Sequence, residues 1–346
     1  MKSAQSLTSN QLPKLTTIGL LIISCGLTAL VLLAFGIRSI SITLILGTLA
    51  FLPIGFAIST VVEGRRKASD RLASHLVTIA FVIAVLPLVS LLSETIAKGM
   101  DRFDLQFFTY SMHNVIGDGG GATHAIQGTL IVTGIATLIS VPIGLLVAIF
   151  LVEYSSGKLG SAIRFFVDVM TGIPSIVAGL FAYALFSILI GPGTRNGLSG
   201  AIALAVLMIP YVVRSAEEML QLVPHDLREA SFALGIPKWR TILHVVLPTA
   251  SSGIISGIML TIARVMGETA PLLVTAGLTS SINSNPLSNP MTTLPVFVYY
   301  QYMTPGIPLE PYQARAWAGA LTLIAIIMIL NLAGRVIANR FTKNSR

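Results

Sequence analysis

Two charges, Arg264 and Glu268, lie inside an otherwise uncharged stretch that is long enough to cross a membrane. A charged side chain at the centre of a membrane costs about 2.5–3.5 kcal/mol. If 249–276 is one helix, Glu268 lies four residues after Arg264 on the same face and neutralises it. A guanidinium also matches the geometry of phosphate oxygens. The pair therefore indicates either a packing ion pair between spans or a charge that lines the path of an anionic solute.

Arg214 is a third candidate for such a path, at the end of the uncharged run 196–213. It could equally be a cationic anchor at a membrane surface.

The sequence offers few residues for redox, metal or phosphate-loop chemistry. The single cysteine, Cys25, excludes internal disulfides and a CxxC pair, and the five histidines form no HExxH-like metal site. The glycine run 117–121 has no Lys, Ser or Thr in the positions of a phosphate-binding loop, so it predicts a flexible connector.

The elements that position these charges must be membrane helices. Of 346 residues, 54% are apolar and 10% are charged, with a mean hydropathy of +0.84. Soluble domains carry roughly 25% charged residues, so this chain is predicted to be an all-α integral membrane protein. The net charge of +8 therefore reflects loop residues that orient the spans, and no nucleic-acid partner is expected.

Uncharged runs of about the 20 residues needed for a span are 15–37, 39–62, 72–93, 125–152, 169–194, 196–213 and 316–334. With 249–276, they predict about eight transmembrane helices and place both termini on one side. Lys and Arg concentrate on the side of the termini, which the positive-inside rule makes cytoplasmic. The opposite side carries Arg38, Lys98, Arg102, Arg195 and Arg315. The charged tract 63–71 is predicted to be a solvated cytoplasmic loop.

The long cytoplasmic segment 214–246 predicts a docking element. Asp226, Arg228 and Glu229 follow Pro224 and predict the start of a short helix. Leu234 and Gly235 end that helix, and Pro237 begins a second one. Two short helices joined by a tight turn on the cytoplasmic face would suit a partner protein.

Within this segment the sequence resembles the EAA motif of ABC-importer permeases. The matching residues are Glu229, Ala230 and Ser231, then Leu234 and Gly235, and after nine further residues Val245, Val246, Leu247 and Pro248. Ser231 stands where the motif has Ala. The resemblance implies that this loop couples the chain to a cytoplasmic ATPase, with Glu229 facing a basic residue of that partner. No GxxxxGK[ST] sequence occurs here, so ATP and Mg would be bound by the partner, and this chain is expected to be no enzyme and to bind no cofactor or metal.

Further stretches over 65–340 resemble the PstA-type permeases of bacterial phosphate-specific ABC importers. They are 174–180, 214–220, 263–273, 294–296 and 316–319. The resemblance implies a type-1 permease core over 125–340 with the coupling loop at 214–248, preceded by a basic loop, first span and outer loop over 63–124. An additional hairpin, 1–62, departs from the family. In that family, the charges matching Arg214, Arg264 and Glu268 are thought necessary for transport.

The implied function is half of a membrane pathway for inorganic phosphate in the bacterial cytoplasmic membrane. The implied partners are a second permease (PstC type), a dimeric ATPase (PstB type) and an extracytoplasmic binding protein (PstS type). Another oxyanion, such as molybdate, sulfate or phosphonate, is the nearest alternative. A multi-span membrane enzyme would need an interfacial cluster of acids, bases or metal ligands, which the sequence does not show. A secondary transporter would usually show inverted repeats and broken helices.

Overall fold

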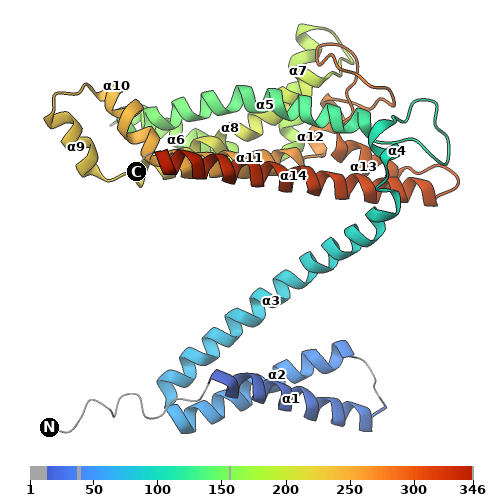
Figure 1. Ribbon diagram of the computed structural model, residues 1–346, viewed down its shortest axis with the longest axis vertical. Helices are drawn as coiled ribbons and strands as arrows, with labels where there is room; N and C mark the ends of the chain where they lie inside the picture. Colours follow the sequence, from blue (N-terminus) through green and yellow to red (C-terminus); the bar gives the residue numbers. More distant parts are fainter. Residues whose placement is uncertain (1–13, 37–39, 156, 345–346) are drawn as a thin grey trace. The chain divides into compact units, whose positions relative to one another are not determined.

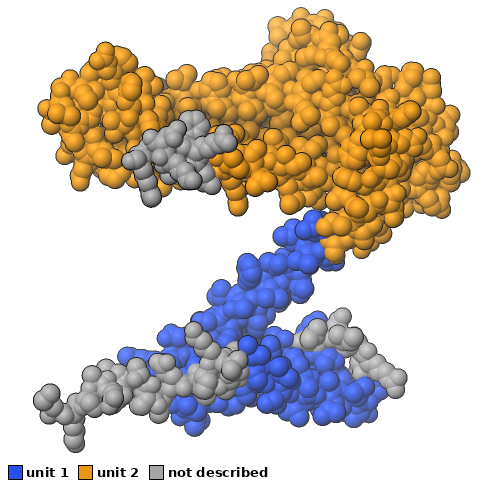
Figure 2. Space-filling model, in the orientation of Figure 1, with its two compact units in different colours: residues 1–92 blue, residues 93–346 orange. Residues whose placement is uncertain are grey.

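The computed structural model describes residues 14–36, 40–155 and 157–344, and over these residues it contains helices and no strand (Figure 1). The all-α prediction is confirmed. The chain divides into two compact units, 1–92 and 93–346 (Figure 2). Among the described residues six helices are long and apolar enough to cross a membrane, or seven if a bent pair is one span, and a shorter apolar helix occupies Ile18–Ala34. These counts agree with about eight spans.

Unit 1 contains α1 (Lys14–Ala34), α2 (Ile40–Glu63) and most of α3 (Arg65–Gly99). The Ser24 hydroxyl of α1 donates a hydrogen bond of 2.8 Å to the Gly47 carbonyl of α2. The prediction of a loop over 63–71 is wrong, because α3 begins at Arg65, directly after Gly64. Arg71 on α3 contacts the Glu63 carboxylate at 2.7 Å, so these charges bind two adjoining helix ends together.

Unit 2 is built around α5 and α8, which pack along each other with α11, α12 and α13 against them. Small side chains such as Ala136, Ala201 and Ala205 are buried between them and let the helix backbones approach closely. The elements of this unit, after the end of α3, are η2 (Met100–Arg102), α4 (Leu105–Thr109), α5 (Thr123–Ile149), η3 (Phe150–Tyr154), α6 (Lys158–Thr171), α7 (Ser175–Leu189), α8 (Gly197–Gln221), α9 (His225–Ala233), α10 (Lys238–Thr241), η4 (Ile242–Val246), α11 (Leu247–Met266), α12 (Ala270–Thr275), α13 (Leu294–Met303) and α14 (Glu310–Asn344).

The predicted span 169–194 is not a single straight helix. It combines the end of α6 with α7, and the two helices meet at an angle of 104°. Pro174 causes the break, because it has no backbone N–H and disfavours helical geometry at the residue before it. The bend could not be seen in the sequence, because the run 169–194 is uncharged throughout and α7 alone is as apolar as a membrane span.

The predicted span 249–276 has different limits. α10, η4 and α11 form one helical run, Lys238–Met266, in which Ile242–Val246 is a π-helical turn. The run ends before Gly267, and a break separates it from α12. The expected second short helix of the docking segment is therefore the beginning of a long helix.

α9 and α10 lie at one end of unit 2, and α4 and α13 lie at the other (Figure 1).

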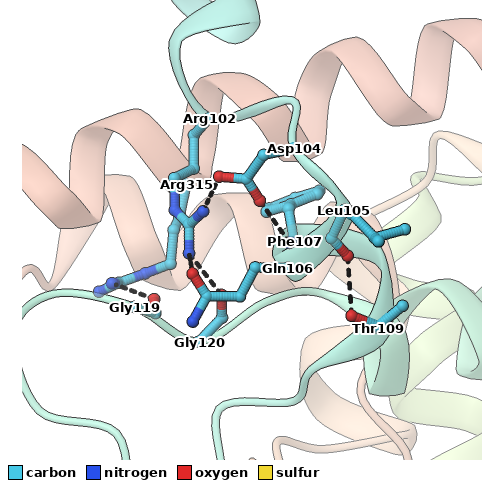
Figure 3. Close-up of polar contacts among 9 residues, drawn as sticks. All are labelled: Arg102, Asp104, Leu105, Gln106, Phe107, Thr109, Gly119, Gly120 and Arg315. Atoms are coloured by element: carbon cyan, nitrogen blue, oxygen red, sulfur yellow. Dashed lines mark hydrogen bonds and ion pairs between the residues drawn. The ribbon is translucent and has the colours of Figure 1, made fainter.

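The glycine run 117–121 is held in place, in contrast to the predicted flexible connector. Arg315, the fully buried arginine of α14, donates to the carbonyls of Gly117 at 2.6 Å and Gly119 at 3.1 Å. Arg102 donates to the carbonyl of Gly120 at 2.9 Å (Figure 3).

Candidate functional site

Arg264 lies on the last turn of α11 and stacks on an aromatic ring of α8. Its Cζ atom is 4.2 Å from the ring centroid of Tyr211, a cation–π distance. The side chain is otherwise exposed, and within the described ranges no carboxylate forms an ion pair with it. Its positive charge therefore has no negative counterpart in the described part of this chain.

Glu268 does not neutralise Arg264, so that expectation is wrong. The helix that carries Arg264 ends at Met266, and Glu268 lies in the break that follows. The Glu268 amide donates to the Val265 carbonyl at 3.1 Å, in a turn that closes the end of α11. Four residues place two side chains on one face only while the helix continues, and here it does not.

The break after α11 brings together two of the stretches that carry the family resemblance. α12 packs on α7, and Gly179 of α7 lies against Pro271 of α12. A Cβ atom at Gly179 would be 2.6 Å from the Pro271 Cα, so no larger residue fits without moving the backbone. The glycine thus sets how closely the broken helix approaches α7, a few residues from Glu268.

Arg214, in contrast to Arg264, belongs to a network of ion pairs. Its guanidinium contacts the Asp168 carboxylate of α6 and lies 3.8 Å from a carboxylate oxygen of Glu217. Glu217 is buried on α8 and accepts a 2.7 Å hydrogen bond from Nε of Arg164. Arg214 therefore joins α6 to α8, and it shares no acidic partner with Arg264 among the described residues.

The coupling segment has the predicted form at its first helix. α9 follows Pro224, carries Asp226 in its first turn and ends before Leu234. Gly235 has φ +73°, the left-handed conformation that favours glycine after a helix. Glu229, Ala230 and Leu234 are exposed, and Leu234 is 80% exposed. This arrangement presents a carboxylate and an apolar tip to the surroundings.

Ser231, which replaces the Ala of the motif, has a definite partner. Its buried hydroxyl lies 2.8 Å from the hydroxyl of Thr241 on α10, which is also buried. The replacement therefore adds a polar contact across the turn between α9 and α10.

Sequence reasoning missed the ion pair that attaches α9. Nε and Nη2 of Arg228 donate to Oε1 of Glu153 at 3.0 and 2.9 Å, and both side chains are buried. Glu153 directly follows an apolar run and Arg228 precedes the EAA-like residues. Both resemble ordinary charges at helix ends, so nothing in the sequence pairs them across 75 positions.

A cleft of about 420 Å³ is lined by residues of η3, α6, α9 and α10 and by the last residue of α8. Its charged lining consists of Glu153, Arg164, Arg228 and Lys238, with His225 beside them. Over the described residues, no group of three or more His, Cys, Asp or Glu side chains is arranged to hold a metal ion.

Comparison with known proteins matches residues 140–343 to the family described as binding-protein-dependent transport system inner membrane component. The phosphate transport system permease protein PstA 1 of Mycobacterium tuberculosis (strain ATCC 25618 / H37Rv) is 42% identical over 285 residues, covering 82% of this chain and 91% of that protein. The phosphate transport system permease protein PstA of Yersinia pestis is 38% identical over 286 residues, covering 81% and 95%.

Two solved structures share the fold. A chain of the inward-facing MetNI methionine ABC transporter has a TM-score of 0.53 at 22% identity, covering 63% of this chain and 95% of that one. A chain of a bacterial alginate ABC transporter, in complex with an alginate pentasaccharide-bound periplasmic protein, has a TM-score of 0.55 at 12% identity, covering 79% and 98%. With the matched family and the close relatives, they show that this chain is a multi-pass membrane permease subunit, not an enzyme, and belongs to the binding-protein-dependent inner membrane components as a member of the PstA family.

Proposed function

We propose that this chain forms half of the membrane pathway through which an ATP-driven importer moves inorganic phosphate into the cytoplasm. The similarity to PstA permeases over 82% of the chain carries the choice of substrate. The exposed guanidinium of Arg264 supports it physically, because it has no carboxylate partner in the described chain and offers a planar fork of donors to an oxyanion.

In this proposal Arg264 attracts the anion, and Glu268, beyond the helix break, limits how tightly the anion is held. Arg214 contributes by holding α6 against α8, since its charge is already paired with Asp168. The ring of Tyr211 holds the Arg264 guanidinium at one position. A guanidinium fixed in this way keeps its donor fork available without first having to become ordered.

The proposed partners are a second permease of PstC type, a dimeric ATPase of PstB type that binds ATP and Mg, and a binding protein of PstS type outside the cell. The exposed residues of the coupling segment, Glu229, Ala230, Leu234 and Gly235, would contact the ATPase, with Ser231 fixing the turn behind them. α9 and the C-terminal end of α14 lie at the same end of unit 2 (Figure 1). This supports a cytoplasmic C-terminus, and we place the N-terminus on the same side.

ATP-dependent uptake into proteoliposomes tests the substrate. The chain is reconstituted with its permease, ATPase and binding-protein partners, and radiolabelled phosphate, sulfate, molybdate and a phosphonate are supplied in turn. We expect uptake of phosphate that the other oxyanions do not replace. Uptake of sulfate or molybdate without uptake of phosphate would contradict the proposal.

Substitution of Arg264 tests the site. Arg264→Gln should reduce phosphate uptake by about 100-fold, the size expected when two charge-assisted hydrogen bonds are lost. Arg264→Lys should restore only part, because an ammonium keeps the charge and loses the fork. Arg335→Gln, at an exposed arginine of α14, is the matched control. If Arg264→Gln combined with Glu268→Gln transports like the unmodified complex, the two charges are architectural and the assignment is wrong.

A further inference from the structure

Three cations from three helical elements converge on η3, the π-helical turn that continues α5 at its C-terminal end. Arg164 of α6 donates to the Leu151 carbonyl at 2.8 Å, and Lys238 of α10 donates to the Glu153 carbonyl. Arg228 of α9 binds the Glu153 side chain through two nitrogens. The last carbonyls of a helix lack intrahelical donors and carry the negative end of its dipole, so cations are favoured there.

Arg228 binds the end of a second core helix as well. Its Nη1 donates to the Val223 carbonyl at 2.5 Å, and its Nη2 donates to the Leu220 carbonyl at 2.9 Å. Both carbonyls belong to the C-terminal end of α8 and the turn after it. One guanidinium thus joins α9 to η3 and to the end of α8. η3 continues α5, and α5 and α8 are the two helices at the centre of the unit 2 core.

The attachment of α9 is polar. Its two buried side chains are Arg228, bonded to Glu153, and Ser231, bonded to Thr241. Hydrogen bonds of good geometry depend on angle as well as distance, so these few contacts fix the orientation of α9 relative to the elements that it binds. A displacement of α9 therefore acts on Arg228 and on the groups that it binds in η3 and at the end of α8.

We propose that Glu153 is a positioning residue that transmits movement of α9 to the core helices. This inference rests on the proposed function, since it takes the ATPase as the source of that movement. The chain of contacts continues along α8, which carries Tyr211, and the ring of Tyr211 stacks with Arg264. Arg228 thereby links the docking helix to the helix that supports the pathway charge, and Glu153 holds the guanidinium that makes this link.

The test compares Glu153→Gln with the unmodified chain in the reconstituted complex. Glutamine has the same shape and keeps one oxygen that can accept from Arg228, so α9 retains a partner while the charge is lost. Glu94→Gln removes an exposed carboxylate that is paired with Lys98 at 2.7 Å, and it is the matched control. The measurements are co-purification of the ATPase, ATP hydrolysis, and phosphate transported per ATP hydrolysed.

We expect Glu153→Gln to assemble and hydrolyse ATP while phosphate transported per ATP falls by about tenfold, within the usual range of coupling free energies. A second variant adds Arg228→Gln, which leaves no uncompensated buried charge. If Glu153 only balances the charge of Arg228, this double variant transports like the unmodified complex, and the proposal is overturned. An unchanged ratio in Glu153→Gln also overturns it. Failure of the unmodified complex to transport phosphate would instead count against the proposed function.

Discussion

The two ends of unit 2 use arginine in opposite ways. At one end Arg315 donates to carbonyls of the glycine run 117–121, in a region that also buries Phe107, Leu294 and Phe297 in an apolar cluster. At the other end Arg228 holds a helix that buries no apolar side chain of its own. The glycine run is thus fixed by a core and an arginine together, whereas α9 depends on a few directional contacts.

This difference indicates which end is suited to move. A segment held by apolar packing shifts only if its core is repacked, and close-packed interiors resist that. A segment held by a few hydrogen bonds can rotate as a rigid body, and those bonds then pass its movement to the groups that they join. We therefore expect changes around Arg315 to alter stability, and changes around α9 to alter the proposed coupling to the ATPase.

The largest effect on stability is expected at Arg315. Arg315→Met keeps the approximate volume but leaves the carbonyls of Gly117 and Gly119 without their donor, which should cost about 2–5 kcal/mol of folding stability. The measurement is the apparent midpoint of thermal unfolding in detergent. Arg335→Met, an exposed position on the same helix, is the control and should change little. A stable Arg315→Met protein that assembles but no longer couples ATP hydrolysis to transport would reverse the comparison.

A smaller effect is expected at Gly235. No atom lies within 4 Å of a Cβ added there, so the cost comes from the backbone conformation alone. Gly235→Val forces a β-branched residue into left-handed geometry at φ +73°, which should cost about 1–2 kcal/mol locally. We expect weaker co-purification of the ATPase and less transport per ATP, with normal membrane insertion.

Gly235→Asn separates backbone strain from side-chain bulk, since asparagine tolerates the left-handed region. It should couple nearly as well as the unmodified chain. Equal loss in both variants would mean that the ATPase surface needs a bare backbone here, and the turn geometry would not be the cause.

The smallest effect is expected at Ser231. Ser231→Ala leaves the buried Thr241 hydroxyl without this partner and should cost about 1 kcal/mol. Adding Thr241→Val removes the second hydroxyl and should recover most of the loss. Coupling ratios of the two variants, measured side by side, test whether the contact holds α9. A larger loss in the double variant would show that the threonine has another role.

Local signals in the sequence predicted most of the helices, including α9. Pro224 and Gly235 bound α9 by backbone geometry, which depends on neighbouring residues alone. The bend at Pro174 and the break after Met266 were missed because apolar composition continues across both. Glu153 and Arg228 were missed for a different reason. An ion pair between residues far apart depends on how helices pack, and a single sequence contains no periodicity that reports it.

The π-helical turn at η4 has a consequence for rotation about the helix axis. Each residue of an α-helix turns about 100°, and a π turn inserts one extra residue without breaking the helix. Thr241, before η4, contacts α9, whereas Ile254, after it, packs into the core. The π turn therefore sets the rotation of the part before η4 about the helix axis separately from the rotation of the part after it. Deletion of one residue within 242–246 would rotate the part of the helix that carries Thr241 away from α9. The part that carries Ile254 would still face the core.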